Sequence, residues 1–158
     1  MTGTRRRSDG PAGSASGVSR GTLDDVILGI GVDVADIRRL EAALARTPHL
    51  AARLFAESER ELPMRALAGS FAAKEAVAKA LGAPPGLRWT DAIVRRDSRG
   101  RPALETRGTV AAVAASLGVT AWHVSISHDA GICVAMVVAE GRGQPAPDRT
   151  EASRATER

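Results

Sequence analysis

The regular pattern of the chain opens with an alternation of apolar residues and small or polar residues in the segment VILGIGVD, residues 26–33. A period of two is typical of a β-strand with two different faces. The face that we expect to pack on the core carries Val26, Leu28, Ile30 and Val32. Gly29 and Gly31 leave the other face nearly bare, so that another backbone or a ligand can approach the strand just before Asp33.

A helical periodicity follows this strand. Asp36 suits the N-cap of a first helix, whose apolar stripe is Ile37, Leu40 and Leu44. Short helical pieces are predicted over residues 50–62, and they end near Pro63. A long helix is then predicted over residues 67–81, with Gly82 as the residue that ends it.

The remaining segments predict two pairs of strands and one more helix between them. A loop rich in Gly and Pro leads into a hairpin whose turn lies at residues 97–100. Residues 108–118 form an amphipathic pattern with three residues facing inward, Val110, Val113 and Leu117. Two strands follow within residues 121–140, joined at residues 127–131. The second of them is apolar on both faces, so we expect it to be central in its sheet.

The order of these elements predicts an α+β domain in which a mostly antiparallel sheet packs against the long helix. We expect the domain to span residues 23–140. Residues 1–22 and 141–158 are rich in Gly, Ser, Arg and Pro, and such segments bury too little apolar surface to offset the entropy of ordering. Both are therefore predicted to be disordered tails.

Charge and composition narrow the function classes. The sequence pI is about 10.5, but the excess positive charge lies in the two tails, and residues 23–140 carry 14 basic and 14 acidic residues. With this balance and only four aromatic residues, we expect no nucleic-acid binding. Cys133 is the single cysteine and is expected to be a buried, inert thiol. No apolar run suits a signal peptide or a membrane span, so the sequence predicts a cytoplasmic protein without membrane contact.

Candidate chemistry lies on the long helix, in the stretch FAAKEAVAKALG at residues 71–82. Its inward stripe is predicted to be Ala73, Ala76, Val77, Ala80 and Leu81. This leaves Phe71, Glu75 and Lys79 aligned on another side at a spacing of four. A Glu followed by a Lys four residues later is common on solvated helix faces, where it contributes only ~0.2–0.5 kcal/mol.

Further acid and base positions lie where strands end. Asp33 closes the first strand, and His128 and Asp129 lie in the last hairpin turn. Each has a simpler interpretation: Asp33 can cap a helix, Asp129 can accept hydrogen bonds from turn amides, and His128 can be an exposed turn histidine. Ser127 projects to the face opposite Ile126 and is available as a hydroxyl donor.

Taken together, these residues predict a site for a phosphorylated ligand and a hard cation. Mg²⁺ prefers one or two carboxylates together with phosphate oxygens and water, and Asp33 and Glu75 can supply the carboxylates. Lys79 can neutralise phosphate, and backbone amides between Gly82 and Gly86 can approach it closely.

At these residues the sequence strongly resembles the holo-acyl-carrier-protein synthase family, the short type of 4′-phosphopantetheinyl transferase. The resemblance runs through GIGVDVADIRRLE, FAAKEAVAKALG and HVSISHDAGICVAMVVAE, in this order and at this spacing. It implies the fold of this family of transferases and covers nearly the whole of residues 23–140.

The resemblance also implies residue roles. Asp33 and Glu75 match the family's Mg²⁺ ligands, Lys79 matches the lysine that contacts the coenzyme A diphosphate, and His128 matches a histidine near the phosphates. Arg39, with its neighbour Arg38, falls where the family grips its acidic carrier protein.

One position departs from the family pattern. The family often has Arg where this chain has Ser70, and that Arg contacts phosphate. Arg53, Arg65 and Arg88 are candidates to replace it, and we include Arg53 among the predicted coenzyme A contacts.

The function implied by the resemblance is transfer of the 4′-phosphopantetheine arm of coenzyme A to a serine of an apo acyl carrier protein, with release of 3′,5′-ADP. The carrier would serve fatty-acid or polyketide biosynthesis. A homotrimer with active sites between subunits is also implied. The proton of the serine would pass to a water polarised by Glu75, to Asp129 or to Asp33.

Two other functions compete with this one. The first is a metal-dependent phosphohydrolase, suggested by the dipeptide His128–Asp129. The second is a non-catalytic module that binds the carrier or coenzyme A.

Overall fold

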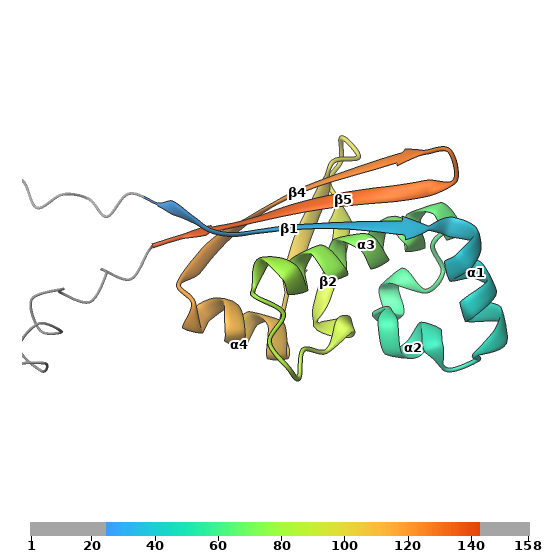
Figure 1. Ribbon diagram of the computed structural model, residues 1–158, viewed down its shortest axis with the longest axis horizontal. Coiled ribbons are helices and arrows are strands. Elements are labelled where there is room, and N and C mark those ends of the chain that lie inside the picture. Colours follow the sequence, from blue (N-terminus) through green and yellow to red (C-terminus); the bar gives the residue numbers. More distant parts are fainter. Residues whose placement is uncertain (1–24, 143–158) are drawn as a thin grey trace, which may run out of the picture.

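A computed structural model of the protein describes residues 25–142 (Figure 1). Its elements in chain order are β1 (Val26–Asp36), α1 (Ile37–Arg46), α2 (Leu50–Leu54), η1 (Glu57–Glu59), α3 (Met64–Ala80), η2 (Trp89–Asp91), β2 (Ala92–Arg96), β3 (Pro102–Thr106), α4 (Gly108–Ser116), β4 (Val119–Asp129) and β5 (Ile132–Gly141). The tails predicted at residues 1–22 and 141–158 lie outside the described residues, apart from Gly141 and Arg142.

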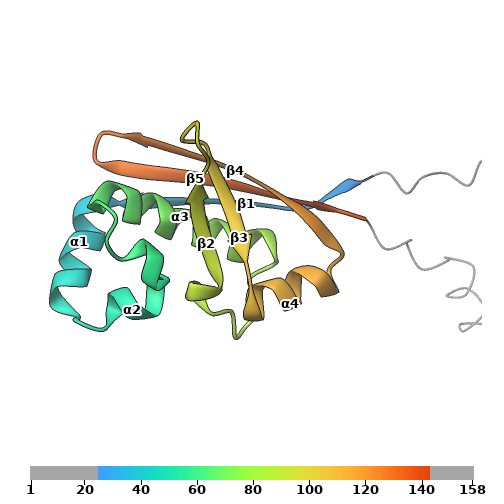
Figure 2. The same ribbon diagram turned by 180° about the vertical axis from the view of Figure 1, so that it is seen from behind.

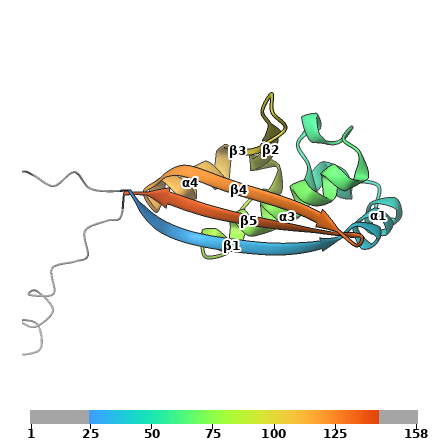
Figure 3. The same ribbon diagram turned by 90° about the horizontal axis from the view of Figure 1, so that it is seen from above.

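Two antiparallel sheets form the β-structure. The larger has the strand order β1-β5-β4, so β5 is central, as its apolar character on both faces predicted (Figure 3). The smaller is the β2–β3 hairpin, whose turn at residues 97–100 is closed by a hydrogen bond from the Gly100 amide to the Asp97 carbonyl at 2.9 Å. The α+β class and the antiparallel pairing are as predicted, but the hairpin forms a sheet of its own.

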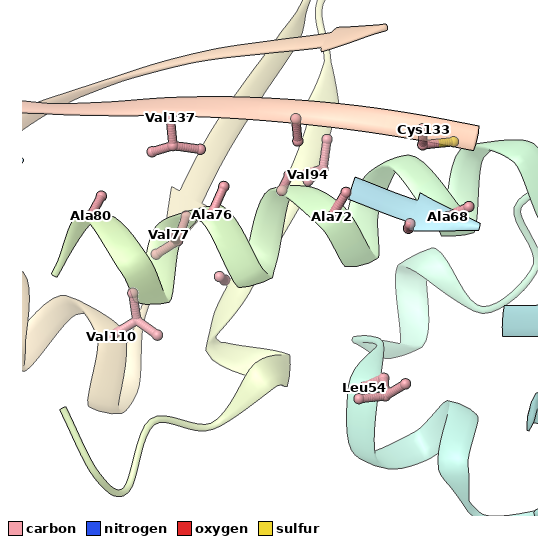
Figure 4. Close-up of a cluster of buried hydrophobic side chains, with 14 of the residues drawn as sticks. Leu54, Ala68, Ala72, Ala76, Val77, Ala80, Val94, Val110, Cys133 and Val137 are labelled. Atoms are coloured by element: carbon pink, nitrogen blue, oxygen red, sulfur yellow. The ribbon is translucent and has the colours of Figure 1, made fainter. Parts of the chain in front are cut away.

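Helix α3 runs lengthwise along one face of the larger sheet. The β2–β3 hairpin and α4 lie on the same side of that sheet, next to the helix (Figures 1 and 2). The buried side chains between these layers are small. Ala76 and Val77 of α3 lie below Val137 of β5, and Val110 of α4 packs from beneath (Figure 4). Small aliphatic residues allow such close packing of helix on sheet. Within the described part of the chain, no helix has both the length and the apolar run needed to cross a bilayer.

The contact between β1 and α3 is made by backbone, and it overturns the predicted orientation of the strand. A Cβ added at Gly29 would lie 2.0 Å from the carbonyl oxygen of Ala80, and one at Gly31 would lie 1.9 Å from that of Ala76. The glycine face of β1 therefore packs on the helix. Of the two predicted partners for this bare face, another backbone or a ligand, the structure shows the backbone.

The apolar face of β1 points outward instead of into the core, so that expectation was wrong. Ile30 and Val32 are 57% and 52% exposed, and Val26 is also exposed. The physical reason is the closeness of the helix: no side chain fits between the two backbones, so the side chains must occupy the other face.

The start of α1 and the end of α3 both follow the capping signals that the sequence predicted. The Asp36 carboxylate accepts a hydrogen bond from the Arg39 amide at 2.9 Å and so caps α1. At the end of α3 the amides of Gly82 and Ala83 donate to carbonyls of the last turn at 3.0 and 2.7 Å, with Gly82 at φ +79°. This left-handed cap is the termination that glycine permits.

The predicted helical boundaries need two adjustments. Helix α3 begins at Met64, three residues earlier than predicted and directly after Pro63. In α4, Val110 is buried as predicted, but Leu117 is 45% exposed because the helix ends at Ser116 and Leu117 is already the capping residue.

A buried ion pair that the sequence reading did not include fastens α3 to the hairpin. The Lys74 ammonium lies 2.8 Å from the Glu59 carboxylate and also donates to the carbonyls of Trp89, at 3.0 Å, and Ala92. Glu59 accepts in turn from the Val94 amide. Burial lowers the pKa of Lys74, and the hydrogen bond and charge of Glu59 oppose this shift. Every donor of the ammonium has an oxygen partner, which is the condition for keeping a charge inside a core.

This arrangement predicts a strong asymmetry between buried and exposed ion pairs. Lys74→Met leaves the Glu59 carboxylate buried without a cation, and we expect it to lower the free energy of unfolding by ~3–5 kcal/mol in urea titrations. The matched control is Arg95→Ala, which removes the exposed pair of Arg95 with Glu105 at 2.9 Å. Its expected cost is below ~1 kcal/mol. Similar costs for the two variants would contradict the structural role given to Lys74.

Candidate active site

An ion pair joins β1 to the last turn of α3. Its carboxylate is that of Asp33, which was predicted to close the strand but lies three residues before the end of β1 at Asp36. The Lys79 ammonium lies 2.7 Å from the Asp33 carboxylate and also donates to the Val32 carbonyl at 2.9 Å. Only because Gly31 lets the two backbones touch can these groups, 46 residues apart in the chain, reach each other. Asp33 does not cap α1, since Asp36 does so, and the simpler interpretation of Asp33 is excluded.

Glu75 lies one helical turn before Lys79 and faces the same site. Burial raises the pKa of the Glu75 carboxyl, the negative charge of Asp33 raises it further, and Lys79 opposes both. Two carboxylates are thus close enough to repel each other, and a cation placed between them would relieve that repulsion.

The donor set fits Mg²⁺ better than a metal held wholly by protein. Within residues 25–142, no group of three or more His, Cys, Asp or Glu side chains is arranged to hold a metal ion. Mg²⁺ is usually held by one or two carboxylates, with phosphate oxygens and water completing its octahedron. Asp33 and Glu75 match that pattern if a phosphorylated ligand binds beside them.

These charged groups lie on the wall of a pocket of about 710 Å³ between β1, α1, α2 and α3. Arg39 also lines it, and so does an apolar wall that includes Leu40, Leu50, Leu54, Phe71 and Trp89. The rings of Phe71 and Trp89 pack with their centroids 6.5 Å apart. Sequence reasoning missed Trp89 as a wall residue, because it follows an irregular Gly- and Pro-rich loop that carries no periodic signal.

His128 lies against the other side of α3. Its Nε2 is 3.0 Å from the Arg65 carbonyl oxygen, and because a carbonyl only accepts, Nε2 carries the proton and donates. His128 lines two smaller pockets, of about 350 and 300 Å³, together with Arg65. In a single chain it does not share the pocket of Asp33 and Glu75.

Of the two neighbours of His128 on β4, Asp129 lines the pocket of about 300 Å³ together with His128, whereas Ser127 lines neither pocket of His128. The Asp129 carboxylate accepts a hydrogen bond from the Ala130 amide at 2.8 Å, which is the turn contact expected in its simpler interpretation. Ser127 is exposed on the outer face of the sheet, opposite to His128, because successive strand residues alternate between faces.

The remaining predicted ligand-binding residues are spread around the site. The Gly82 amide is engaged in the α3 cap, while Gly86, at φ +85°, lies in the loop that follows. Arg53 is exposed at the end of α2 and is not part of the wall of the large pocket. Arg38 and Arg39 are both exposed on α1, and of the two only Arg39 lines the pocket.

Comparison with known proteins decides the family. The ACPS model of the 4′-phosphopantetheinyl transferase superfamily matches residues 29–136. The chain belongs to this superfamily. This transferase is 61% identical, over 121 residues, to the holo-[acyl-carrier-protein] synthase of Streptomyces coelicolor, an alignment that covers 73% of this chain and 98% of the relative. The predicted family is therefore confirmed.

Solved structures confirm the predicted fold. The transferase superposes on the holo-(acyl-carrier-protein) synthase of Bacillus anthracis, solved in complex with CoA (3′,5′-ADP), with a TM-score of 0.59 at 35% identity, covering 73% of this chain and 97% of the other. The Helicobacter pylori enzyme, solved in complex with coenzyme A, gives a TM-score of 0.61 at 29% identity, covering 70% and 98%.

Proposed function

We propose that this transferase moves the 4′-phosphopantetheine group from coenzyme A to a serine hydroxyl of an apo acyl carrier protein. The serine oxygen forms a bond to the β-phosphorus, the one joined to pantetheine, and the bond from that phosphorus to the bridging oxygen breaks. The serine loses its proton and 3′,5′-ADP leaves. The observation that carries the proposal is the Asp33–Lys79 pair beside Glu75, in a chain that is 61% identical to a holo-acyl-carrier-protein synthase.

Asp33 and Glu75 would hold Mg²⁺, which when bound supplies positive charge to the diphosphate and to the leaving group. Lys79 now neutralises Asp33, and its ammonium is exposed enough to donate to a diphosphate oxygen as well. The pocket orients the donor through its apolar wall and its charged rim.

Of the three candidates for removing the serine proton, Glu75 acting through a water molecule has the most support. Asp33 is engaged by Lys79, and Asp129 is engaged by the Ala130 amide in a different pocket. Glu75 lies in the large pocket with Asp33 and Lys79, beside the place proposed for the diphosphate, so that a water molecule held by its carboxylate would lie near the attacking serine.

The carrier protein would bind at α1. Arg38 and Arg39 are exposed there, and Arg39 reaches the rim of the pocket that holds the proposed reacting groups. An acidic carrier docked on these arginines would present its serine beside the diphosphate.

A homotrimer with active sites between subunits is supported by two features of the single chain. The outer face of the larger sheet is apolar and exposed at Ile30, Val32, Val34, Ile132 and Met136, and soluble monomers rarely leave such a continuous patch open. In addition, the His128 pocket and the Asp33 pocket are separate in one chain. A neighbouring copy that covers the apolar face can bring its His128 to the Asp33 pocket.

The competing functions have less support. A phosphohydrolase built on His128 and Asp129 needs further metal-binding side chains, and none form such a cluster within the described residues.

One experiment distinguishes the transferase from both alternatives. The protein is incubated with coenzyme A, Mg²⁺ and an apo carrier, and the mass of the carrier is measured. We expect the carrier to gain the mass of one phosphopantetheine. An unchanged carrier with coenzyme A bound to the protein would indicate a non-catalytic module, and release of inorganic phosphate would indicate a hydrolase.

The cytoplasmic location and the biosynthetic pathway stay predictions. The buried Cys133, the one cysteine of the sequence, suits a reducing compartment such as the cytoplasm. Measuring the masses of fatty-acid and polyketide carriers after the same incubation would show which class of carrier is modified.

Glu75→Gln tests the metal role. The variant keeps the size and helix propensity of Glu75 but removes one negative charge from the cation site, so we expect turnover to fall about 10²-fold or more with the circular dichroism spectrum unchanged. Glu61→Gln, an exposed glutamate outside the pocket wall, is the matched control and should keep full turnover. Normal turnover in Glu75→Gln would remove Glu75 from the proposed mechanism.

Arg39→Glu tests the carrier surface. Reversing this charge should raise the KM for the carrier about tenfold at low salt and leave the KM for coenzyme A nearly unchanged. Arg46→Glu, at the exposed end of the same helix, makes an equal change of charge farther from the pocket and should have a smaller effect. An equal rise of both KM values in Arg39→Glu would show that Arg39 belongs to the coenzyme A site instead.

Ile30→Lys tests the assembly. Ile30 is exposed in the single chain, so a lysine there should not disturb the fold, but it would place a charge in the proposed interface. We expect sedimentation to change from trimer to monomer, together with loss of transfer activity. Ala112→Lys on the exposed side of α4 is the control and should remain a trimer. A monomeric wild-type enzyme with full activity would refute the proposed assembly.

A further inference from the structure

The turn η2 carries Trp89 into the wall of the large pocket, where its ring packs against Phe71. It follows a loop of residues 82–88 that contains two prolines and three residues with positive φ. Loops of this composition lack a regular hydrogen-bond ladder. The position of the Trp89 ring therefore depends on the contacts that hold the turn.

A chain of hydrogen bonds fastens this turn to the beginning of α4, which packs beside η2 at the start of β2 (Figure 2). The Arg88 amide donates to the Thr109 hydroxyl oxygen at 2.9 Å. The Thr109 hydroxyl donates to Oδ2 of Asp91 at 2.9 Å, and the Thr109 amide donates to the same oxygen at 2.8 Å. One hydroxyl thus joins the residue before Trp89 to a carboxylate two residues after it.

The Asp91 carboxylate is confined where it meets α4. Its side chain is only 13% exposed, and a Cβ added at Gly108 would lie 2.4 Å from it. The Arg107 amide donates to the Asp91 carbonyl at 2.8 Å, and the Arg107 guanidinium donates to the Thr90 carbonyl at 3.2 Å. These contacts leave the carboxylate little freedom, so it is a firm anchor for the Thr109 hydroxyl.

The opposite side of the turn is held from the core. The Lys74 ammonium donates to the Trp89 carbonyl at 3.0 Å. A carboxylate that accepts from an amide of the first helical turn is by itself an ordinary cap. Capping α4 does not require the further bond that the Thr109 hydroxyl accepts from Arg88. That extra bond connects the cap to the pocket wall.

We propose that Thr109, anchored by Asp91, is a positioning residue that holds the Trp89 ring in the pocket wall and so sets the affinity of the enzyme for coenzyme A. The inference rests on the proposed function, in which the apolar wall of this pocket orients the donor. Thr109 and Asp91 are not among the residues that line the pocket. They therefore act through Trp89, and a change at Thr109 should alter donor binding more than the chemical step.

The kinetic test compares Thr109→Val with Thr109→Ser. Valine keeps the branched shape of threonine but can neither donate nor accept, whereas serine keeps the hydroxyl. For Thr109→Val we expect the KM for coenzyme A to rise about fivefold, with kcat changed less than about twofold and the KM for the carrier unchanged. Thr109→Ser should restore a KM close to that of the wild type.

A spectroscopic test follows the ring itself. In a Trp122→Phe background, Trp89 is the single tryptophan of the chain, so its fluorescence reports its surroundings directly. Adding Thr109→Val to this background should shift the emission to longer wavelength and increase quenching by acrylamide, because the loosened turn exposes the indole to water. Adding Thr109→Ser should leave both quantities unchanged.

The matched control is Ser116→Ala on the same helix. It removes a hydroxyl that donates to the Val113 carbonyl at 2.8 Å and has no contact with η2. The KM for coenzyme A and the Trp89 emission should stay at wild-type values. A lower melting temperature in Thr109→Val with unchanged KM and emission would reduce Thr109 to an ordinary cap and overturn the proposal, as would an equal rise of both KM values.

Fluorescence and binding keep this proposal separate from the proposed function. If the wild-type protein modifies no carrier, the proposed function fails, but calorimetry with coenzyme A and the emission of Trp89 still test the role of Thr109. Weaker coenzyme A binding together with a shifted emission in Thr109→Val supports the positioning role. Equal affinity and equal emission in variant and wild type refute it.

Discussion

The structure depends on one close contact, the backbone of β1 lying directly on the backbone of α3. At Gly29 and Gly31 there is no space for a Cβ, since the carbonyl oxygens of Ala80 and Ala76 would be only 2.0 and 1.9 Å away. This approach brings the carboxylate of Asp33, two residues after Gly31 on the same strand, to within 2.7 Å of the Lys79 ammonium. The same approach forces the apolar side chains of β1 to the outside, where they form the face that we propose for subunit contact.

Helix α3 can make this contact because it has small residues on the side that faces β1 and a buried lysine on the side that faces the hairpin. Ala76 and Ala80 are small enough for the strand to touch the helix, whereas Lys74 points to the hairpin and holds Glu59, Trp89 and Ala92. Trp89 is itself a wall of the large pocket. The buried ion pair therefore connects the helix that carries the charged groups to the apolar wall that faces them.

Much of the fold could be predicted from periodicity and capping signals, because these depend on neighbouring residues. The central place of β5, the cap at Asp36 and the end of α3 at Gly82 all follow from local patterns. The burial of Lys74 was also within reach, since it lies three residues before Val77, on the edge of the inward stripe. An alternating strand shows that its two faces differ but not which face packs, and so the orientation of β1 was predicted wrongly.

The pairing of Asp33 with Lys79 and Glu75 was within reach of the sequence because motif residues and element ends identified it. The position of His128 was not, since the side of α3 on which β4 places it depends on strand order and register across the whole sheet. That position has a physical consequence. In a single chain His128 does not share the pocket of Asp33, Glu75 and Lys79, and the proposed trimer is the arrangement in which the two come together. The apolar face proposed for that assembly points outward because of the same glycine contact that aligns Asp33.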